Sequence, residues 1–198
     1  MRMSHIGCKE TDMLPIILDV SELTIAIVGS GLQARRRLQM ADAAGAEFVR
    51  VYAADAEDEM RALAGDRLIE SWPSQDELSA CHIVYIANVD DALQERFTAE
   101  ARAVKTLVNV EDVKPLCDFH VPAIVRRGDL LLTASTGGKS PGLARRLKAK
   151  LEEQYPESWD ARLNELSDLR DGWRDEGADF KTLIDRSNQV IDEKGWLA

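Results

Sequence analysis

A glycine-containing turn is the clearest candidate for a ligand site in this sequence. An apolar run ending at Val28 enters Gly29-Ser30-Gly31, and a helical pattern follows. Gly29 suits a tight turn, and Gly31 lets the backbone approach a pyrophosphate at the helix N-terminus. Ala34 occupies the third glycine position of the G-x-G-x-x-G pattern, which tolerates alanine. The segment predicts dinucleotide binding; the alternative is a strand and a helix joined by a turn that binds nothing.

A second glycine-containing segment, Ser135-Thr136-Gly137-Gly138-Lys139-Ser140-Pro141, precedes another helical pattern. It is not a P-loop, because that motif requires a glycine where Thr133 stands. Its hydroxyls, glycine amides and lysine can still bind an anion at a helix N-terminus, with Ser140 as the cap and Pro141 behind it. The alternative is a turn that merely caps the helix.

The distribution of charge agrees with a small anionic ligand. The 198-residue chain has a formal net charge of −10, which disfavours binding to nucleic acids. Residues 120–150 nonetheless hold seven basic residues and one acidic residue, a local charge of +6, whereas residues 151–198 carry −7. A basic patch on an acidic protein favours an anionic small molecule. A solvated helix face is the alternative explanation for the bases from Arg145 to Lys150.

The composition predicts a globular cytoplasmic protein with a substantial core. Hydrophobic residues make up 45% of the chain, yet no apolar run reaches the roughly 18 residues that span a membrane. Residues 1–13 show no secretory signal. No membrane partner is expected. Cys8, Cys81 and Cys117 form neither a C-x-x-C pair nor a metal-site spacing. We expect them to be free thiols in a reducing compartment.

Alternating strand and helix patterns predict an α/β fold with a Rossmann-like, doubly wound parallel sheet. After Asp112 the alternation stops, and residues 119–134 have the pattern of a hairpin with its turn at Arg127-Gly128-Asp129. We therefore predict three parts: an NAD-binding domain over 1–112, a small β region over 113–140 and a helical region over 141–198. Residues 15–20 are expected to form a short strand or an extended lead-in. The expected strands after them are 23–28, 48–53, 68–70, 82–87 and 106–110; the expected helices are 32–44, 55–64, 90–103 and 141–153, with a helical turn at 75–81.

Side-chain positions within these elements can also be predicted. Leu38 and Ala41 should face the core from the first helix. Pro156 is expected at the first position of a helix. Its apolar side would comprise Trp159, Leu163, Leu166, Leu169 and Trp173, and that of a final helix would comprise Phe180, Leu183, Ile184 and Ile191. His82, at a strand start, and His120, within a strand, are expected to be structural, because lone histidines lack partners for a metal site.

Several segments, in their order along the chain, resemble one family. They are Leu14-Pro15-Ile16, Val28-Gly29-Ser30-Gly31, Asn109-Val110-Glu111-Asp112, Phe119-His120-Val121-Pro122-Ala123-Ile124 and the run from Ser135 to Arg145. Over residues 13–152 the chain is similar to the precorrin-2 dehydrogenase/sirohydrochlorin ferrochelatase family, found alone or as the N-terminal module of siroheme synthase. The resemblance implies NAD-dependent oxidation of precorrin-2 to sirohydrochlorin by a homodimer, with residues 113–140 as the β region for dimerisation and substrate binding. In some members the same site then inserts Fe²⁺, and the sequence leaves that activity and its metal site open.

The resemblance also implies roles for individual residues. Asp112 matches the family's essential aspartate, which would act as a general base; the alternative is a loop-end aspartate bonded to backbone. Asp55 lies where an acid binds the ribose, or it caps the following helix. An acid near the end of the second strand favours NAD, whereas Arg50 within that strand does not, so the choice between NAD and NADP stays open. The predicted cofactor residues are Gly29, Ser30, Gly31, Leu32, Gln33, Ala54, Asp55, Asn88 and Asp90.

The substrate is a polycarboxylate, for which the basic region supplies candidate partners. Thr136 matches a position that is a regulatory phosphoserine in some members. Two other functions remain open: a non-catalytic tetrapyrrole- or nucleotide-binding protein on the same fold, and an NAD(P) oxidoreductase of another small substrate. The predicted substrate residues are Asn109, Ser135, Thr136, Gly137, Gly138, Lys139 and Arg145.

Overall fold

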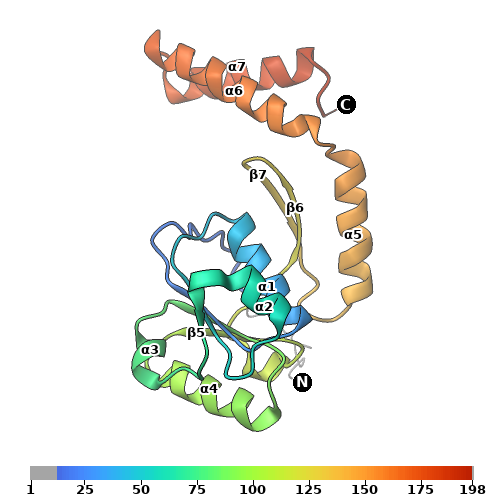
Figure 1. Cartoon of the computed structure of the whole chain (residues 1–198). Helices are drawn as coiled ribbons and strands as arrows, with labels where there is room; N and C mark the ends of the chain where they lie inside the picture. The colour runs from blue at the N-terminus through green and yellow to red at the C-terminus, as the bar shows by residue number, and fades with distance from the viewer. Residues whose placement is uncertain (1–12, 198) are drawn as a thin grey trace, which may run out of the picture. The chain divides into compact units, whose positions relative to one another are not determined.

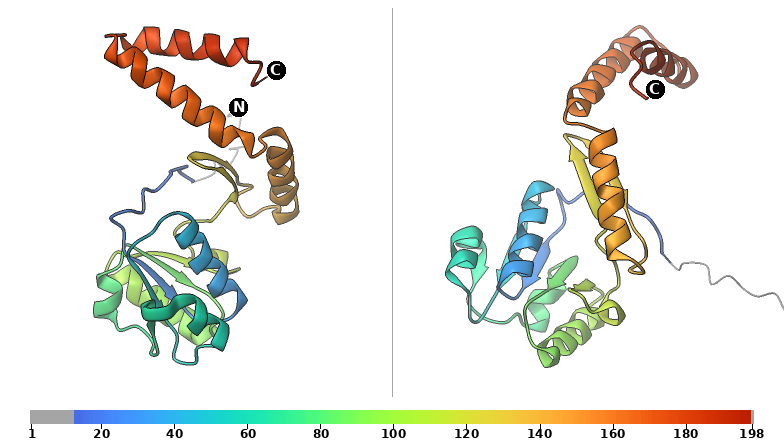
Figure 2. Two further views of the ribbon diagram at one scale, coloured as in Figure 1. Left: turned by 45° about the horizontal axis from the view of Figure 1, so that its top comes forward. Right: turned by 90° about the vertical axis from the view of Figure 1, so that its right-hand side faces the viewer.

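The computed structural model describes residues 13–197, which form two compact units that divide between His120 and Val121 (Figures 1 and 2). Unit 1 contains a five-stranded parallel sheet with the strand order β3-β2-β1-β4-β5. Unit 2 contains a two-stranded antiparallel sheet and three helices. The predicted α/β class is confirmed, including the change from βα repeats to a hairpin.

Unit 1 follows the predicted alternation of strands and helices. Its strands are β1 Ile25–Val28, β2 Val49–Tyr52, β3 Leu68–Ile69, β4 Ile83–Ile86 and β5 Leu107–Val110. Its helices are α1 Leu32–Ala43, α2 Asp58–Ala64, α3 Gln75–Ser79 and α4 Asp91–Ala103, with short 3₁₀ turns at Gly65–Arg67 and Lys114–Leu116. β1 lies between β2 and β4, and all of its pairings are parallel.

The core of unit 1 forms on both faces of this sheet. Every residue of β1 and β4 is buried, as expected for the central strands of a parallel sheet covered by helices. Leu38 and Ala41 of α1 are buried as predicted. Trp72 packs against Phe97 of α4 with ring centres 5.8 Å apart. The sheet therefore gives the loops at its ends a rigid support.

Unit 2 begins with the predicted hairpin. Its elements are β6 Ala123–Arg127, β7 Leu130–Ala134, α5 Pro141–Gln154, α6 Ser158–Asp175 and α7 Phe180–Glu193. Arg127 pairs with Leu130 across the turn, where Gly128 has φ +56°. A Cβ atom at Gly128 would lie 2.0 Å from Oδ1 of Asp160, so the turn packs tightly against α6. α5 packs against both strands.

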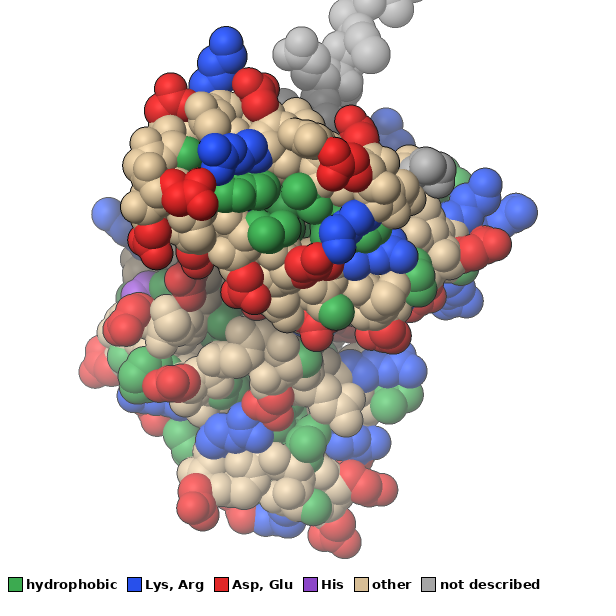
Figure 3. Space-filling model, turned by 90° about the horizontal axis from the view of Figure 1, so that it is seen from above, with side chains coloured by type: hydrophobic (Ala, Val, Ile, Leu, Met, Phe, Trp, Pro, Cys, Tyr) green, Lys and Arg blue, Asp and Glu red, His purple; other side chains and the backbone are tan. Residues whose placement is uncertain are grey.

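The two C-terminal helices differ from the prediction in detail. α6 begins at Ser158 after Glu157, so the placement of Pro156 as its first residue was wrong. In α7, Leu183 is buried, but Phe180 and Ile184 are 74% and 40% exposed. α7 packs against α6, which covers only part of the apolar stripe of α7. Figure 3 shows hydrophobic side chains in a band on this pair, bordered by charged ones.

Other boundaries also need correction. Residues 15–20 contain no strand, so of the two alternatives for that segment the short strand was wrong, and α2 begins later than predicted. His120 lies before β6 rather than within a strand, because Pro122 has no N–H for the ladder and pairing starts at Ala123. Cys81 and Cys117 are free thiols as predicted, whereas Cys8 lies outside the described residues. Over residues 13–197, no helix is both long enough and apolar enough to cross a membrane.

Candidate functional site

The loops that carry the predicted cofactor residues lie at one edge of the sheet in unit 1. The strands are parallel, so the turns after β1, β2, β4 and β5 share their carboxyl end. The chain order reverses between β1 and β4, which is where ligands bind in open α/β sheets. Among these turns, Asp90 caps α4, because its Oδ1 accepts a hydrogen bond from the N–H of Leu93 at 2.8 Å.

Both glycines of the first turn occupy positions that other residues could not adopt without strain. Gly29 has φ +120° and Gly31 has φ +89°. A Cβ atom at Gly29 would lie 1.8 Å from the carbonyl oxygen of Ala87, and one at Gly31 would lie 3.0 Å from Cγ of Asn88. Both glycines are buried, and their lack of side chains allows the loop after β4 to pack closely against the turn. The turn leads directly into α1, whose N-terminal dipole favours an anion.

Asn88 reaches from the end of β4 to the start of α1. Its backbone is left-handed, with φ +57°. Its Oδ1 accepts hydrogen bonds from the N–H groups of Gln33 (3.0 Å) and Ala34 (3.1 Å), and its Nδ2 donates to Oε1 of Gln33 (2.8 Å). Because Gly31 has no side chain to cap α1, Asn88 supplies the cap from a neighbouring strand. Leu32, at the first position of the helix, is half exposed beside this contact.

The turn after β2 lies beside the glycine turn. The hydroxyl of Ser30 accepts a hydrogen bond from the N–H of Glu57 at 2.9 Å. Glu57 is the N-cap residue of α2, so the alternative in which Asp55 caps this helix was wrong. Asp55 is exposed and Ala54 is half-buried. Their predicted contacts with the cofactor stay predictions.

Asp112 occupies a tight turn directly after β5. The N–H of Val113 donates to the carbonyl of Val110 at 3.3 Å, and Asp112 has φ +59°. This left-handed conformation costs a non-glycine residue about 1–2 kcal/mol, and such residues cluster at functional sites. The Asp112 side chain is exposed, and it makes no hydrogen bond or ion pair with the residues that the structure describes. The alternative of an aspartate bonded to backbone therefore has no support in its contacts.

The buried side of this turn is held by hydrogen bonds from two side chains, those of Cys117 and Asn109, to backbone carbonyl groups. Sγ of Cys117 lies 3.1 Å from the carbonyl oxygen of Val110 and 3.4 Å from that of Val113. Burial raises the pKa of the Cys117 thiol, so the thiol stays protonated and can donate. Asn109 is 5% exposed, and its Nδ2 donates to the carbonyl of Phe119 at 2.9 Å. Asn109 thus has a structural role here, and its predicted contact with substrate remains a prediction.

A partly buried ion pair ties α1 to the turn of Asp112. Arg37 donates to Oε2 of Glu111 through Nε at 3.0 Å and also through Nη2. Its guanidinium lies 5.7 Å from the ring centre of Tyr85, which meets Phe119 edge-on at 5.4 Å. None of these four residues was predicted as part of the site. The available signals were the run of three arginines after the glycine turn and the acid that precedes Asp112.

We expect replacement of Arg37 by methionine to lower the free energy of unfolding by about 1.5 kcal/mol. The side chains of Arg37 and Glu111 are 18% and 24% exposed. Their pair thus falls between exposed pairs, worth under about 1 kcal/mol, and buried pairs, whose disruption costs about 3–5 kcal/mol. Arg36→Met, at an exposed position of the same helix turn, is the control and should cost under about 0.5 kcal/mol. Equal losses for both variants in urea unfolding would contradict a role for the pair.

The second predicted loop belongs to unit 2 and joins β7 to α5. Oγ1 of Thr136 accepts a hydrogen bond from the N–H of Ser140 at 3.2 Å and donates to its carbonyl at 3.1 Å. Oγ of Ser140 accepts from the N–H of Leu143 at 3.2 Å, and Pro141 is the first residue of α5. The prediction that Ser140 caps this helix is confirmed. The other predicted residues of this region are all at least partly accessible: Ser135, Gly137, Gly138, Lys139 and Arg145.

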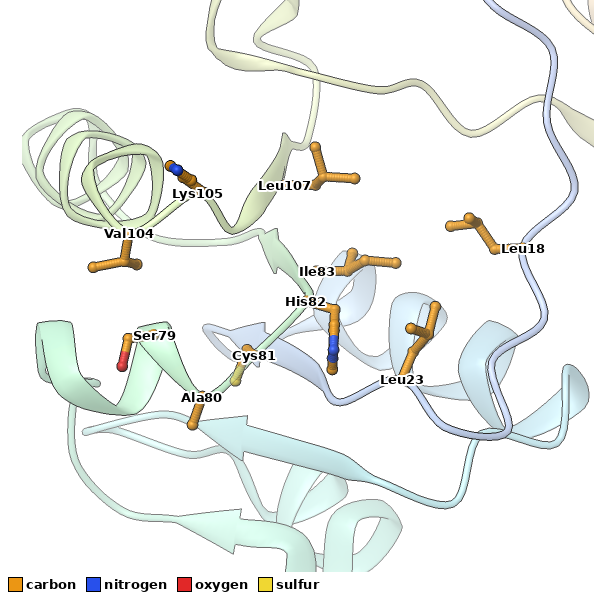
Figure 4. A pocket seen from close by; sticks show the side chains of 10 residues that line it. All are labelled: Leu18, Leu23, Ser79, Ala80, Cys81, His82, Ile83, Val104, Lys105 and Leu107. Atoms are coloured by element: carbon orange, nitrogen blue, oxygen red, sulfur yellow. The ribbon is translucent and has the colours of Figure 1, made fainter.

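A hollow of about 450 Å³ opens at the opposite, amino end of the sheet in unit 1 (Figure 4). Leu18, Leu23 and Leu107 give it apolar walls, and His82 also lines it. Nδ1 of His82 accepts a hydrogen bond from the N–H of Thr24 at 3.0 Å, in agreement with a structural role. Ligands of such sheets bind at the carboxyl end, so this hollow is separate from the dinucleotide position. Within residues 13–197, no three His, Cys, Asp or Glu side chains are grouped to hold a metal ion.

Comparisons with known proteins agree with this geometry. The model of the NAD_binding_7 family, described as "Putative NAD(P)-binding", matches residues 16–123, which include the glycine turn and Asp112. The siroheme synthase of Nitrosococcus oceani is 36% identical over 149 residues, which is 74% of this chain and 32% of that protein. The siroheme synthase of Pseudomonas entomophila is 35% identical over 182 residues, 90% of this chain and 37% of that protein. The chain thus spans about a third of the length of the curated relatives it matches.

A solved structure extends the similarity to both units. The precorrin-2 dehydrogenase SirC matches with a TM-score of 0.72 and 25% sequence identity, over 94% of this chain and 93% of that chain. The shared fold therefore includes the region after Asp112, beyond the residues of the family model. The chain belongs to the NAD(P)-binding family that contains the N-terminal module of siroheme synthase and the precorrin-2 dehydrogenase SirC.

Proposed function

We propose that this chain oxidises precorrin-2 to sirohydrochlorin with NAD as the hydride acceptor. The observation that carries the proposal is the position of Asp112, an accessible carboxylate in a left-handed turn at the same sheet edge as the glycine turn. The names of the relatives, siroheme synthase and precorrin-2 dehydrogenase, support this choice of substrate. Insertion of Fe²⁺ as a second substrate is tested separately below.

The residues around the glycine turn fit a dinucleotide. Side chains at Gly29 or Gly31 would collide with the loop after β4, so both positions beside the start of α1 require glycine. When bound, NAD supplies the hydride acceptor of the reaction. We propose that the pyrophosphate binds beside the turn at the N-terminus of α1, and that the ribose lies toward Asp55. The residues assigned to this site are Gly29, Ser30, Gly31, Leu32, Gln33, Ala54, Asp55, Asn88 and Asp90.

The oxidation removes one hydride and one proton from the macrocycle. Asp112 is proposed to take the proton on a carboxylate oxygen, as a general base, and to release it to water afterwards. Its exposed position leaves the carboxylate accessible to a substrate. The carboxylates of the substrate are proposed to bind to the loop from Ser135 to Lys139 and to Arg145, where hydroxyls, amides and cations can all bind an anion.

The test is an anaerobic incubation of the purified chain with enzymatically generated precorrin-2 and NAD, without metal. We expect the visible spectrum of sirohydrochlorin to appear together with an equal amount of NADH. Fe²⁺ added afterwards then tests chelation. No spectral change with a folded protein would contradict the dehydrogenase and favour a binding protein. Quenching of protein fluorescence by porphyrinoids would then separate a tetrapyrrole-binding protein from an oxidoreductase of another substrate.

We further propose that unit 2 mediates homodimer formation. β6 and β7 form a sheet of only two strands, whose outer edges are unpaired among the described residues. A two-stranded sheet is marginal by itself and gains stability from further strands or packing. Leu143 and Leu147 lie one turn apart on α5 and are 50% and 37% exposed. An apolar strip of this kind favours a protein partner.

Light scattering should give about twice the chain mass of 22.0 kDa. Replacing both Leu143 and Leu147 by lysine should weaken the dimer at least tenfold, because two charges would have to be desolvated in the interface. Leu197→Lys is the control, since Leu197 is 63% exposed near the end of the chain. A monomeric mass for the unmodified chain would contradict the proposed dimer.

A further inference from the structure

An arginine and two glutamates meet where the glycine turn touches the turn after β2. Nη1 of Arg35, in α1, lies 2.6 Å from Oε2 of Glu57 and 3.9 Å from Oε2 of Glu59. The Arg35 side chain is 21% exposed, whereas those of Glu57 and Glu59 are 53% and 70% exposed. The turn after β2, which contains Glu57, also contacts the glycine turn through the hydrogen bond from the N–H of Glu57 to Ser30. Arg35 is therefore held in place, and its charge is balanced by two carboxylates.

In dinucleotide-binding folds, the turn after the second strand, where Arg35 meets Glu57 here, determines which dinucleotide binds. The ribose of the adenosine half lies at the end of the second strand, where an acid binds its 2′-hydroxyl in NAD enzymes. In NADP enzymes, a nearby arginine accommodates the 2′-phosphate instead. Arg35 is thus the residue type that would attract NADP, while residues 55–59 contain four acids that would repel a phosphate. The choice of cofactor depends on which of these charges dominates.

We propose that Glu57 and Glu59 determine the specificity for NAD by neutralising Arg35. Unpaired, the guanidinium could bind a 2′-phosphate through two parallel hydrogen bonds. Because Arg35 is paired with the two glutamates, Arg35 and residues 55–59 together carry a net negative charge. A 2′-phosphate would bring nearly two further negative charges beside them. NAD brings only a hydroxyl there and avoids this repulsion. The inference deepens the proposed function and rests on its use of a dinucleotide, not on precorrin-2.

The structure also removes a competing explanation. Arg50, the other basic residue that the sequence places near this end of the sheet, interacts with Tyr52, Glu77 and Cys81. Glu77 belongs to α3, and Cys81 lies just before β4 at the amino end of the sheet. The side chain of Arg50 therefore lies toward the amino end of the sheet. Arg35 is the arginine that contacts the turn after β2.

The experiment measures the dissociation constants of NAD and NADP by calorimetry on the full chain. The variant E57Q/E59Q keeps the size of both side chains, and it keeps the backbone bond from residue 57 to Ser30. We expect NADP to bind at least tenfold more tightly to this variant than to the unmodified chain, with the affinity for NAD changed less than threefold. Adding R35M to the same variant should abolish the gain.

A matched control removes the same charge elsewhere. E22Q/E47Q deletes two exposed carboxylates that precede β1 and β2, at the amino end of the sheet. It should leave the preference for NAD unchanged. An unchanged NADP affinity in E57Q/E59Q, an equal gain in E22Q/E47Q or a gain that persists without Arg35 would overturn the inference. If NAD binds the unmodified chain and only these shifts fail, the proposed function stands; if neither dinucleotide binds, both fail.

Discussion

Replacing Asp112 by asparagine is expected to lower kcat for precorrin-2 oxidation by about 10²–10⁴-fold, the usual contribution of a positioned general base. The carboxamide has nearly the same shape but cannot accept the proton. Asparagine also adopts the left-handed conformation readily, so the turn with φ +59° should persist. The loss should therefore come from chemistry, not from unfolding. Stopped-flow spectroscopy of sirohydrochlorin formation measures kcat, and NAD titration checks that the cofactor affinity stays within twofold.

The control for this variant is Asp66→Asn, which removes an exposed carboxylate from the 3₁₀ turn after α2. It should leave kcat unchanged, because Asp66 precedes β3 and therefore lies at the amino end of the parallel sheet, opposite the carboxyl ends of β1 and β5. Asp112→Ala is a useful second variant, since alanine adds the cost of a left-handed backbone to the loss of the carboxylate. Normal turnover by Asp112→Asn would show that another group takes the proton.

Replacing Gly29 by alanine is expected to destabilise unit 1 strongly. The new Cβ would lie 1.8 Å from the carbonyl oxygen of Ala87, a backbone atom fixed beside β1 by the hydrogen bond from the Ala87 N–H to Val28 at 3.0 Å. The φ of +120° adds strain for any residue with a side chain. Overpacking and strain together should cost about 3–5 kcal/mol. Calorimetric unfolding should show the loss, and NAD binding should be abolished.

Gly45→Ala separates the two causes. Gly45 has φ +77°, but a Cβ atom there would meet nothing within 4 Å. Its substitution should cost only the backbone strain of about 1–2 kcal/mol and leave NAD affinity intact. Similar losses of unfolding free energy for the two variants would mean that the loop after β4 can shift to make room for a Cβ atom at position 29. Close packing would then not explain the glycine there.

Local sequence was sufficient to predict most of unit 1. Ile25–Val28 and Ile83–Ile86 are apolar runs bounded by turn residues, and they became the central strands because both of their faces are covered. The start of α2 was predicted less well. It depends on Ser30, which bonds the N–H of Glu57 from 27 residues away. A helix start that is determined by a distant hydroxyl leaves no signal in the neighbouring residues.

In unit 2, periodicity predicted the helices but not the burial of their side chains. Phe180 and Leu183 belong to the same apolar stripe of α7, yet Phe180 is 74% exposed and Leu183 is 6% exposed. The stripe indicates which face is apolar, whereas burial depends on the position of α6 beside it. Arg170 of α6 illustrates the dependence, since its Nη1 donates to Oγ of Ser187 in α7 at 2.9 Å.

The sequence by itself determined the parallel sheet, the glycine turn, the hairpin and the position of Asp112 directly after a strand. These features depend on residue type and on spacing over a few positions, and both can be read from the local sequence without knowing which distant residues will be in contact. Only the tertiary structure decided that Asn88 caps α1, that Arg37 pairs with Glu111 and that Glu57 pairs with Arg35. These partners stand 55, 74 and 22 residues apart, so the packing of the sheet and its helices is what brings them together.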